Sequence, residues 1–184
     1  MEKTAKGVVI WENYKRNSCY PPVSVFDTKQ GYWQKRKREW KERGLRSDTG
    51  REDALLGKGL KDLAEKHGSK LTGTSIFDPV LCEVVYKWFC PEKGVVYDPF
   101  AGGSVRGIVA EVCGLKYIGI DLSQKQIDAN QINADKFGVC PAWFCDDSKN
   151  ADKYLQDESA DMVFSCPPYH NLEKYSNHPL DLSN

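Results

Sequence analysis

From residue 95 onward, short apolar segments alternate with longer segments of helical pattern, and this alternation leaves few folds open to the chain. The pattern predicts that each apolar segment is a buried strand and that each intervening segment is a helix. Such strand–helix–strand units are right-handed and build a parallel sheet. We therefore expect an α/β fold with strands at 95–97, 117–120, 142–144 and 161–164, and helices at 104–113, 123–137 and 149–155.

The turn that follows the first expected strand is rich in glycine. It reads Asp98-Pro-Phe-Ala-Gly-Gly-Ser104, and glycine at such a turn lets the backbone approach a ligand closely. A dinucleotide site is one interpretation, but the Gly-x-Gly-x-x-Gly order of such sites is absent. Because ligands bind at the carboxyl ends of parallel strands, the sequence predicts a binding site at this turn.

Acidic residues also follow the next two expected strands. Asp121 ends the second strand, about twenty residues after the glycines, where a carboxylate can accept hydrogen bonds from ribose hydroxyls. Asp146 follows the third strand. Three carboxylates at neighbouring strand ends suit a nucleoside with a cationic tail better than a pyrophosphate, because like charges repel. Aspartate after a strand is also a common turn and capping residue, and that interpretation stays open.

The fourth expected strand ends in Ser165-Cys-Pro-Pro-Tyr169. Two consecutive prolines fix the backbone and carry no N–H group, so carbonyl oxygens remain as acceptors. Such a loop can receive the N–H bonds of an amino group and hold its nitrogen towards an electrophile. Tyr169 adds a flat ring on which a base can stack.

These two motifs resemble those of a known enzyme family. Asp98-Pro-Phe-Ala-Gly-Gly103 is similar to the cofactor motif, and Cys166-Pro-Pro-Tyr169 to the catalytic motif, of the DNA amino-methyltransferases, which methylate adenine N6 or cytosine N4. Residues 73–79 resemble the segment beside the methionine end of the cofactor, so the resemblance spans residues 73–176. Residues 26–33 are similar, more loosely, to the leaders of phage and prophage modification methylases of restriction–modification systems.

The resemblance implies a Rossmann-like methyltransferase fold, S-adenosylmethionine as cofactor and DNA as substrate, with adenine N6 favoured over cytosine N4. Asp121 would bind ribose, Asp146 would face the adenine amino group, and the methyl group would pass directly from sulfonium to nitrogen. The implied catalytic residues are Cys166, Pro167, Pro168 and Tyr169. The implied cofactor-binding residues are Ser75, Phe77, Asp98, Pro99, Phe100, Ala101, Gly102, Gly103, Asp121, Leu122, Asp146 and Asp147.

Cys166 departs from the family pattern, which has Asp, Asn or Ser at this position. A thiol is a poor hydrogen-bond acceptor. Either the Pro167 carbonyl accepts the hydrogen bonds of the amino group in its place, or Ser165 contributes, or activity is reduced. A cysteine nucleophile, as in cytosine-C5 methyltransferases, is a further alternative, although in those enzymes the cysteine follows a proline.

The number of strands is a second departure from the family pattern. Only four strands of a normally seven-stranded sheet are readable before residue 184, so we expect the sheet to be incomplete at its C-terminus. Two alternatives to DNA methylation therefore stay open. One is a cofactor-binding but inactive fragment or DNA-binding module, and the other is methylation of RNA or of a protein nitrogen. The recognition sequence and the oligomeric state are not determined by the sequence.

The net charge of zero conceals an uneven distribution along the chain. Residues 1–72 contain 17 Lys and Arg against 10 Asp and Glu, whereas residues 73–184 contain 9 against 16. We expect a basic, mostly helical extension at 1–72 that contacts DNA and a methyltransferase domain at 73–184. Further helices are expected at 60–66 and, beginning with Pro79, at 80–89.

A helix expected at 32–43 contains the basic cluster Lys35, Arg36, Lys37 and Arg38, flanked by Trp33 and Trp40. The cluster is either a phosphate-binding face with aromatic contacts or a solvated charged face. Both interpretations fit the spacing of these residues.

Composition argues against membrane and metal sites. No run approaches the roughly eighteen apolar residues of a membrane span, and the N-terminus lacks the apolar region of a signal peptide, so we expect a soluble, cytoplasmic protein. The seven cysteines include no Cys-x-x-Cys pair, and the three histidines lack partners at ligand spacing. We expect no metal site and reduced, mostly buried cysteines.

Overall fold

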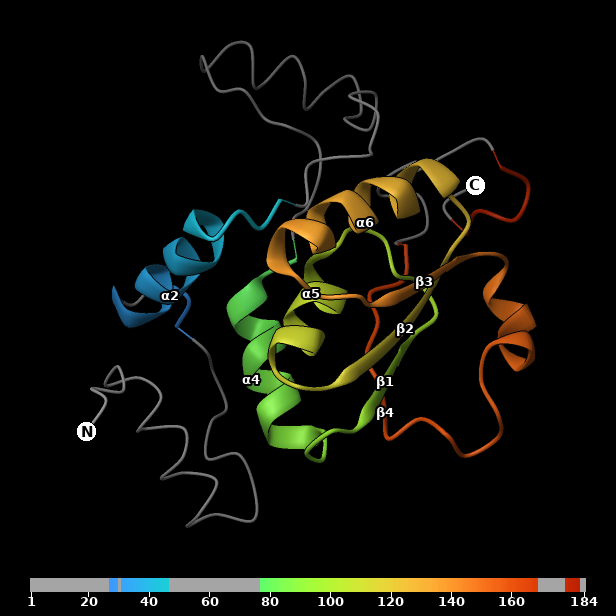
Figure 1. The fold of residues 1–184 in the computed structure, drawn as a ribbon, viewed down its shortest axis with the longest axis horizontal. Helices are drawn as coiled ribbons and strands as arrows, with labels where there is room; N and C mark the ends of the chain where they lie inside the picture. The colour runs from blue at the N-terminus through green and yellow to red at the C-terminus, as the bar shows by residue number, and fades with distance from the viewer. Residues whose placement is uncertain (1–26, 30, 47–76, 169–177, 183–184) are drawn as a thin grey trace.

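The computed structural model describes residues 27–29, 31–46, 77–168 and 178–182 (Figure 1). The helix expected at 60–66 and the domain boundary at 72/73 lie outside these residues. In chain order the elements are α2 (Gly31–Glu42), α4 (Pro79–Phe89), β1 (Val95–Asp98), α5 (Val105–Val112), β2 (Lys116–Asp121), α6 (Gln124–Phe137), β3 (Ala142–Cys145), the 3-10 helix η1 (Ser148–Lys153) and β4 (Met162–Val163).

The described strands form one parallel sheet in the order β3-β2-β1-β4. This sheet, with helices between its strands, confirms the α/β fold expected from the alternating pattern and the Rossmann-like arrangement that the resemblance implies. In the register Asp98 lies beside Gly119, and Asp121 lies beside Cys145. The carboxyl ends of β1, β2 and β3 therefore follow one another along a single edge of the sheet.

Local capping signals explain where the helices begin and end. Asp78 caps α4 by accepting a hydrogen bond from the Val80 N–H, and Pro79 occupies the first turn, where a missing N–H costs little. Ser123 caps α6 in the same way. Gly138 ends α6 in the left-handed conformation, at φ 65°.

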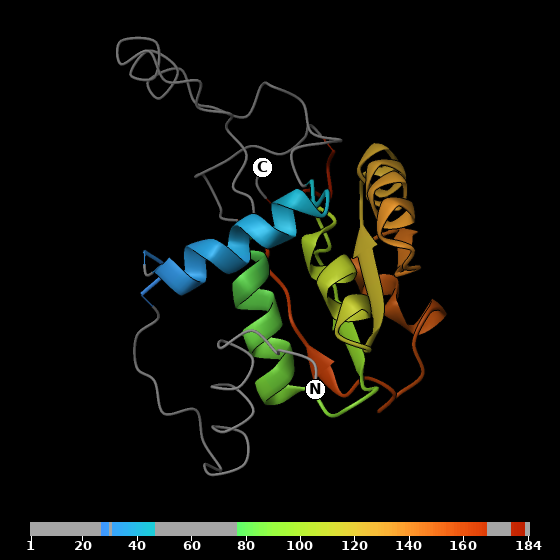
Figure 2. The ribbon, with the colours of Figure 1, turned by 60° about the vertical axis from the view of Figure 1, so that its left-hand side comes forward.

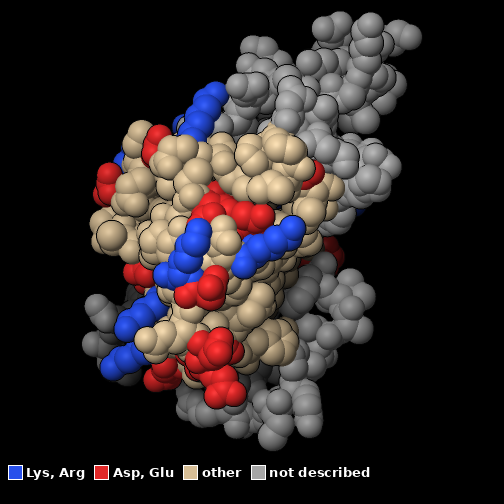
Figure 3. Space-filling view, turned by 90° about the vertical axis from the view of Figure 1, so that its right-hand side faces the viewer, with Lys and Arg blue, Asp and Glu red and all other residues tan. Residues whose placement is uncertain are grey.

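Helices α4, α5 and α6 cover one face of the sheet, and η1 lies on the other side (Figures 1 and 2). Helix α5 approaches the sheet closely because Gly107 has no side chain, and a Cβ there would lie 2.6 Å from the Trp143 ring. On the opposite face Tyr154, just after η1, stacks on Phe144 at 4.1 Å. Figure 3 shows acidic and basic side chains side by side around η1, so this face does not carry a charge of one sign.

Helix α2 packs against α4 and shares the core of the sheet domain (Figure 2). Trp33 and Trp40 are seven residues apart, so they lie on the same helix face, and each is only 1% exposed. Asn133 of α6 accepts a hydrogen bond from the Arg46 N–H at 3.0 Å and donates one to the Gly44 carbonyl at 2.9 Å. Of the two interpretations of this helix, aromatic contacts with nucleic acid do not fit the structure, because both indole rings belong to the core.

The cysteines are free in the described part of the chain, but fewer are buried than expected. Cys82 and Cys90 are buried, whereas Cys140 and Cys145 are exposed. The prediction of mostly buried cysteines is wrong because Cys140 and Cys145 lie just before and at the end of a short strand whose last residue emerges from the sheet. Among the described residues, no group of three potential ligands is arranged for a metal ion, and no helix has the length and apolar run needed to cross a membrane.

Candidate functional site

Four polar side chains lie at the carboxyl edge of the sheet. Asp146, Asp121 and Asp98 come at or just after the ends of β3, β2 and β1, and Ser165 follows β4. Because all four strands are parallel, residues separated by up to 67 positions, such as Asp98 and Ser165, meet here. The edge at which the sequence predicts a binding site is thus the edge where these groups gather.

The glycine turn is held by side chains from β2 and α6. Gly102 has a φ of 51°, a conformation that glycine adopts without steric cost. Its N–H donates to Asp121 Oδ2 at 2.8 Å, and its carbonyl accepts from Asn130 Nδ2 at 2.8 Å. Gly102 and Gly103 are half-buried, so a backbone surface remains that a ligand can reach.

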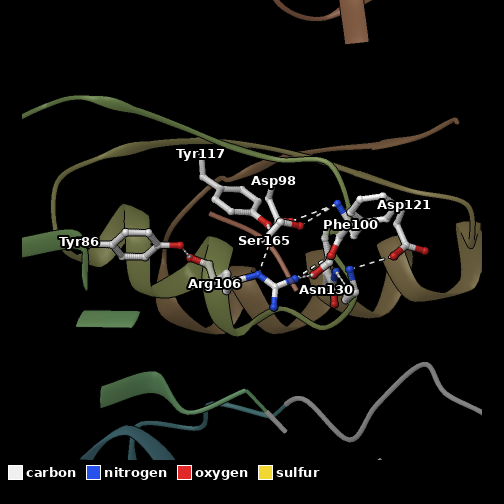
Figure 4. Close-up of polar contacts among 10 residues, drawn as sticks. Tyr86, Asp98, Phe100, Arg106, Tyr117, Asp121, Asn130 and Ser165 are labelled. Carbon is white, nitrogen blue, oxygen red and sulfur yellow. Dashed lines mark hydrogen bonds and ion pairs between the residues drawn. The ribbon is translucent and has the colours of Figure 1, made fainter. Parts of the chain in front are cut away.

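Asp98 is fully buried at the centre of a hydrogen-bond network (Figure 4). Its Oδ2 accepts from Arg106 Nε at 2.6 Å and from the Tyr117 hydroxyl at 2.7 Å. Its Oδ1 accepts from the Ser165 hydroxyl at 2.6 Å and from the Phe100 N–H at 3.1 Å. All four bonds come from the protein, so this carboxylate shapes the turn rather than offering a free acceptor.

Arg106 extends this network to the backbone of the turn. One terminal nitrogen of its guanidinium donates to the carbonyls of Phe100 at 2.7 Å and Ala101 at 3.0 Å. Burial opposes the charge of Arg106, but the adjacent Asp98 carboxylate outweighs burial and raises the pKa of the guanidinium. Burial and the same carboxylate raise the pKa of Tyr117, which keeps its hydroxyl a donor. The Arg106 guanidinium therefore stays charged at any ordinary pH.

Asp121 is half-buried and faces both the turn and the start of α6. Its second oxygen accepts from the Ser123 N–H at 2.8 Å. A carboxylate oxygen has two lone pairs, so accepting one hydrogen bond does not exhaust it. Leu122, the next residue, offers its carbonyl to the Cys145 thiol at 3.6 Å.

Asp146 is bound by residues in and after η1. Its oxygens accept from Asn150 at 2.7 Å, Lys153 at 2.9 Å and Tyr154 at 2.9 Å. The bond from Asn150, followed by those from Lys153 and Tyr154, lowers the pKa of Asp146. The neighbouring Asp147 caps η1 through the Lys149 N–H. Asp146 and Asp147 therefore stabilise η1 through these hydrogen bonds. The cofactor contacts expected of them stay a prediction.

The loop after β4, which begins at Ser165 and contains the two prolines whose carbonyls are expected to accept hydrogen bonds, is called the acceptor loop. The structure describes it as far as Pro168. Cys166 and Pro168 are half-buried and Pro167 is exposed. The Ser165 hydroxyl donates to Asp98 at 2.6 Å and accepts from the Phe100 N–H at 3.2 Å. Its contribution in place of the missing Asp, Asn or Ser at position 166 stays a prediction. Tyr169 and Ser75 lie outside the described residues.

Phe77 and the residues of the turn lie around the same network. The Phe77 ring packs edge-on against Phe164 at 5.5 Å and lies 4.8 Å from the Arg106 guanidinium. Pro99 and Phe100 are half-buried, and Ala101 is buried with its N–H donating to the Ile120 carbonyl at 2.9 Å. The structure thus brings the described residues predicted for the turn next to those predicted after β4.

Sequence reasoning missed the residues that hold the site together: Arg106, Tyr117 and Asn130. One signal could have indicated Arg106, because it is the only charged residue in an otherwise apolar first turn and a half of α5. A charged residue on a buried helix face requires a partner, and the acidic residues closest in sequence are Glu111 and Asp98. Asn130 and Tyr117 carry no comparable signal.

The basic cluster of α2 divides into two kinds of residue. Arg36 binds Glu83 at 2.8 Å and Lys37 binds Asp78 at 2.9 Å, so both are engaged in ion pairs with the sheet domain. Lys35 and Arg38 are exposed. The four residues predicted to contact nucleic acid therefore include two that fasten α2 to the domain.

No protein-family model matches the chain, and no curated protein sequence matches it. Among solved structures, the chain is similar to TrmN from Thermus thermophilus, with a TM-score of 0.45 and 20% identity over 50% of this chain and 29% of that one. It is also similar to PH0851, with a TM-score of 0.42 and 14% identity over 88% of this chain and 48% of that one. The chain thus spans less than half the length of either structure. Similarity at this level assigns no activity, and the expected phage or restriction–modification setting stays a prediction.

Proposed function

We propose that this chain is an S-adenosylmethionine-dependent methyltransferase that transfers a methyl group to an exocyclic amino group of DNA, with adenine N6 as the favoured acceptor. One observation carries the proposal. The turn expected to hold the cofactor and the loop expected to hold the acceptor are joined by a direct hydrogen bond, from Ser165 to Asp98. Two motifs of one reaction therefore lie in contact, although 67 residues separate these two positions.

The chemistry of the site suits this cofactor. The turn at 98–104 contains two glycines and no Lys or Arg, and its one buried carboxylate is neutralised by Arg106. Asp121 adds negative charge at the end of the neighbouring strand, whereas Asp146 is paired with Lys153 at 2.9 Å. A cationic amino acid tail and a ribose fit this arrangement, whereas a pyrophosphate requires donors or cations that the turn does not supply.

The cofactor supplies a methyl group on a cationic sulfur, so the new nitrogen–carbon bond forms as the sulfur–carbon bond breaks and the electron pair leaves with sulfur. The protein then needs chiefly to position the acceptor. Carbonyl oxygens of Cys166 and Pro167 would accept the N–H bonds of the amino group, and Tyr169 would stack on the base. The proton lost from nitrogen passes to water. In this proposal Asp121 binds the ribose, and Ser75 and Phe77 adjoin the methionine end.

DNA is the proposed substrate because the motif pair resembles that of the DNA amino-methyltransferases. The test is incubation of the chain with methyl-labelled S-adenosylmethionine and unmethylated DNA, with RNA and protein in parallel. We expect label in DNA, recovered after digestion as N6-methyldeoxyadenosine. Label in RNA or protein alone would overturn the substrate, and failure to bind S-adenosylhomocysteine in calorimetry would overturn the whole proposal.

A second candidate function is cofactor binding without transfer. Cys166 favours it, because the thiol stands where the family pattern has a stronger hydrogen-bond acceptor. The same two measurements separate the candidates. Binding of S-adenosylhomocysteine without label in any substrate would identify a binding module rather than an enzyme.

Lys35 and Arg38 are the predicted phosphate contacts of α2. In the double variant Lys35→Gln/Arg38→Gln, we expect the slope of log affinity for DNA against log salt concentration to fall by about two, because each phosphate contact releases about one counterion. Fluorescence anisotropy with labelled duplex at several salt concentrations measures this slope. The control is Lys93→Gln/Lys116→Gln, which removes the same charge from exposed positions at the amino ends of β1 and β2, away from the predicted site. Equal slopes for the two double variants would contradict the assignment.

A further inference from the structure

The acceptor loop has few means of holding its position. Backbone pairing between β4 and β1 ends with the Phe164 N–H, which donates to the Tyr97 carbonyl at 3.0 Å. Two of the next four residues, Pro167 and Pro168, have no N–H to donate. In the described part of the loop, the hydrogen bonds beyond Phe164 involve the Ser165 side chain.

Ser165 is the side chain that provides this attachment in the described residues. Its hydroxyl donates to Asp98 Oδ1 at 2.6 Å and accepts from the Phe100 N–H at 3.2 Å (Figure 4). One hydroxyl thus contacts both the carboxylate at the end of β1 and the backbone of the glycine turn. This residue directly precedes the Cys-Pro-Pro segment, and both hydrogen bonds of its hydroxyl go to the glycine turn.

The partner of Ser165 is itself rigidly held. Asp98 is 0% exposed, and its other oxygen accepts from Arg106 and Tyr117. A bond to a charged, fully buried group is stronger than one between neutral groups. The position of Ser165 is therefore fixed by a hydrogen bond to the same carboxylate that shapes the turn.

We propose that Ser165 is a positioning residue, which sets the distance and angle between the acceptor nitrogen and the methyl group by fastening the acceptor loop to Asp98. This proposal rests on the proposed function. In-line transfer tolerates little misplacement of the reacting atoms, and an error of about 1 Å can cost about 100-fold in rate. Ser165 contributes through Asp98 and Phe100, without contact to the reacting atoms.

The first test measures the loop without any cofactor. Alkylation of Cys166 by iodoacetamide, followed by peptide mass spectrometry, reports how freely the loop moves. In Ser165→Ala we expect Cys166 to react about 10- to 100-fold faster, the loss corresponding to one hydrogen bond to a charged group. The exposed Cys140 and Cys145 serve as internal references whose rates stay unchanged. Ser165→Thr keeps a hydroxyl and is expected to restore the slow rate.

Two outcomes of this labelling would overturn the proposal. An unchanged Cys166 rate would show that Ser165 does not hold the loop. Equal acceleration of the buried Cys82 would show a general loss of stability. Ser159→Ala is the matched control, because the Ser159 hydroxyl is exposed and bonds only a nearby carbonyl, that of Gln156 at 2.7 Å.

The second test measures transfer. In Ser165→Ala we expect the single-turnover rate of methyl transfer to fall about 10- to 100-fold, with S-adenosylhomocysteine affinity almost unchanged, because Arg106 and Asp121 still hold the turn. A rate equal to that of the wild-type chain, or an equal loss of affinity and rate, would overturn the positioning role. If the wild-type chain neither binds nor transfers, the proposed function fails, and the role in transfer fails with it even where the labelling result stands.

Discussion

Replacing Asp98 by alanine is expected to lower the free energy of unfolding by about 3–5 kcal/mol, because it leaves the buried Arg106 guanidinium without its counter-charge. The two side chains are 0% and 6% exposed, and water cannot compensate for the loss. Tyr117 and Ser165 lose their acceptor at the same time. Urea unfolding followed by circular dichroism measures the effect. Since folded domains are stable by only about 5–15 kcal/mol, the variant should be close to unfolding.

Two further variants separate the causes of this loss. Asp128→Ala removes a carboxylate from the exposed face of α6, where it accepts only from Gln124, and should change the unfolding midpoint little. Asp98→Asn retains the shape and one acceptor oxygen but removes the charge, so its effect isolates the ion pair. An Asp98→Ala midpoint no lower than that of Asp128→Ala would contradict the central role of this network.

The elements of the fold were predictable wherever a local signal marked them. The helices expected at 80–89, beginning with Pro79, and at 123–137 correspond to α4 and α6. Their ends are set by Asp78 with Pro79, by Ser123 and by Gly138. Each of these residues acts through a hydrogen bond or a backbone angle within about three positions of itself. The parallel sheet followed from the alternation of strands with helices, because such units are right-handed. Its strand order, β3-β2-β1-β4, was not among the predictions.

The partners of the site residues were not predictable in the same way. Asp98 was correctly expected at the turn, but its bonds to Tyr117 and Ser165 span 19 and 67 residues. Such bonds depend on the exact packing of the sheet, which no local pattern encodes. Asp146 is bound by Lys153 and Tyr154 because η1 folds back over the end of β3. Nothing in the local sequence pattern of residues 148–154 predicts this contact.

The placement of α2 shows a similar limit. Two tryptophans beside a basic cluster are consistent both with base stacking and with a helix that packs on a core. Only the presence of α4, with Glu83 and Asp78 placed to bind Arg36 and Lys37, decides between them. Of the four basic residues, Lys35 and Arg38 are exposed, whereas Arg36 and Lys37 are held in ion pairs with α4 and its cap.

Asp121→Ala is expected to lower the affinity for S-adenosylhomocysteine by about 10- to 100-fold, because a carboxylate that accepts hydrogen bonds is lost from the site. Two effects combine in this value. The Gly102 N–H loses the acceptor that holds the turn, at 2.8 Å, and the ribose loses its proposed acceptor. Calorimetry on the folded variant measures the affinity, with Asp128→Ala as the control for a carboxylate removed from an exposed helix face.

A ligand analogue separates the two effects. If Asp121 accepts hydrogen bonds from the ribose, the wild-type chain should bind S-adenosylhomocysteine much more tightly than its 2′,3′-dideoxy analogue, and Asp121→Ala should bind the two ligands almost equally. Each protein gives one ratio, the affinity for S-adenosylhomocysteine divided by the affinity for the dideoxy analogue. Dividing the wild-type ratio by the Asp121→Ala ratio measures the coupling between the carboxylate and the hydroxyls. If the ratio is the same in both proteins, Asp121 acts only on the turn. Asp121 would then support the cofactor through Gly102 alone, and the ribose contact would have to come from another group.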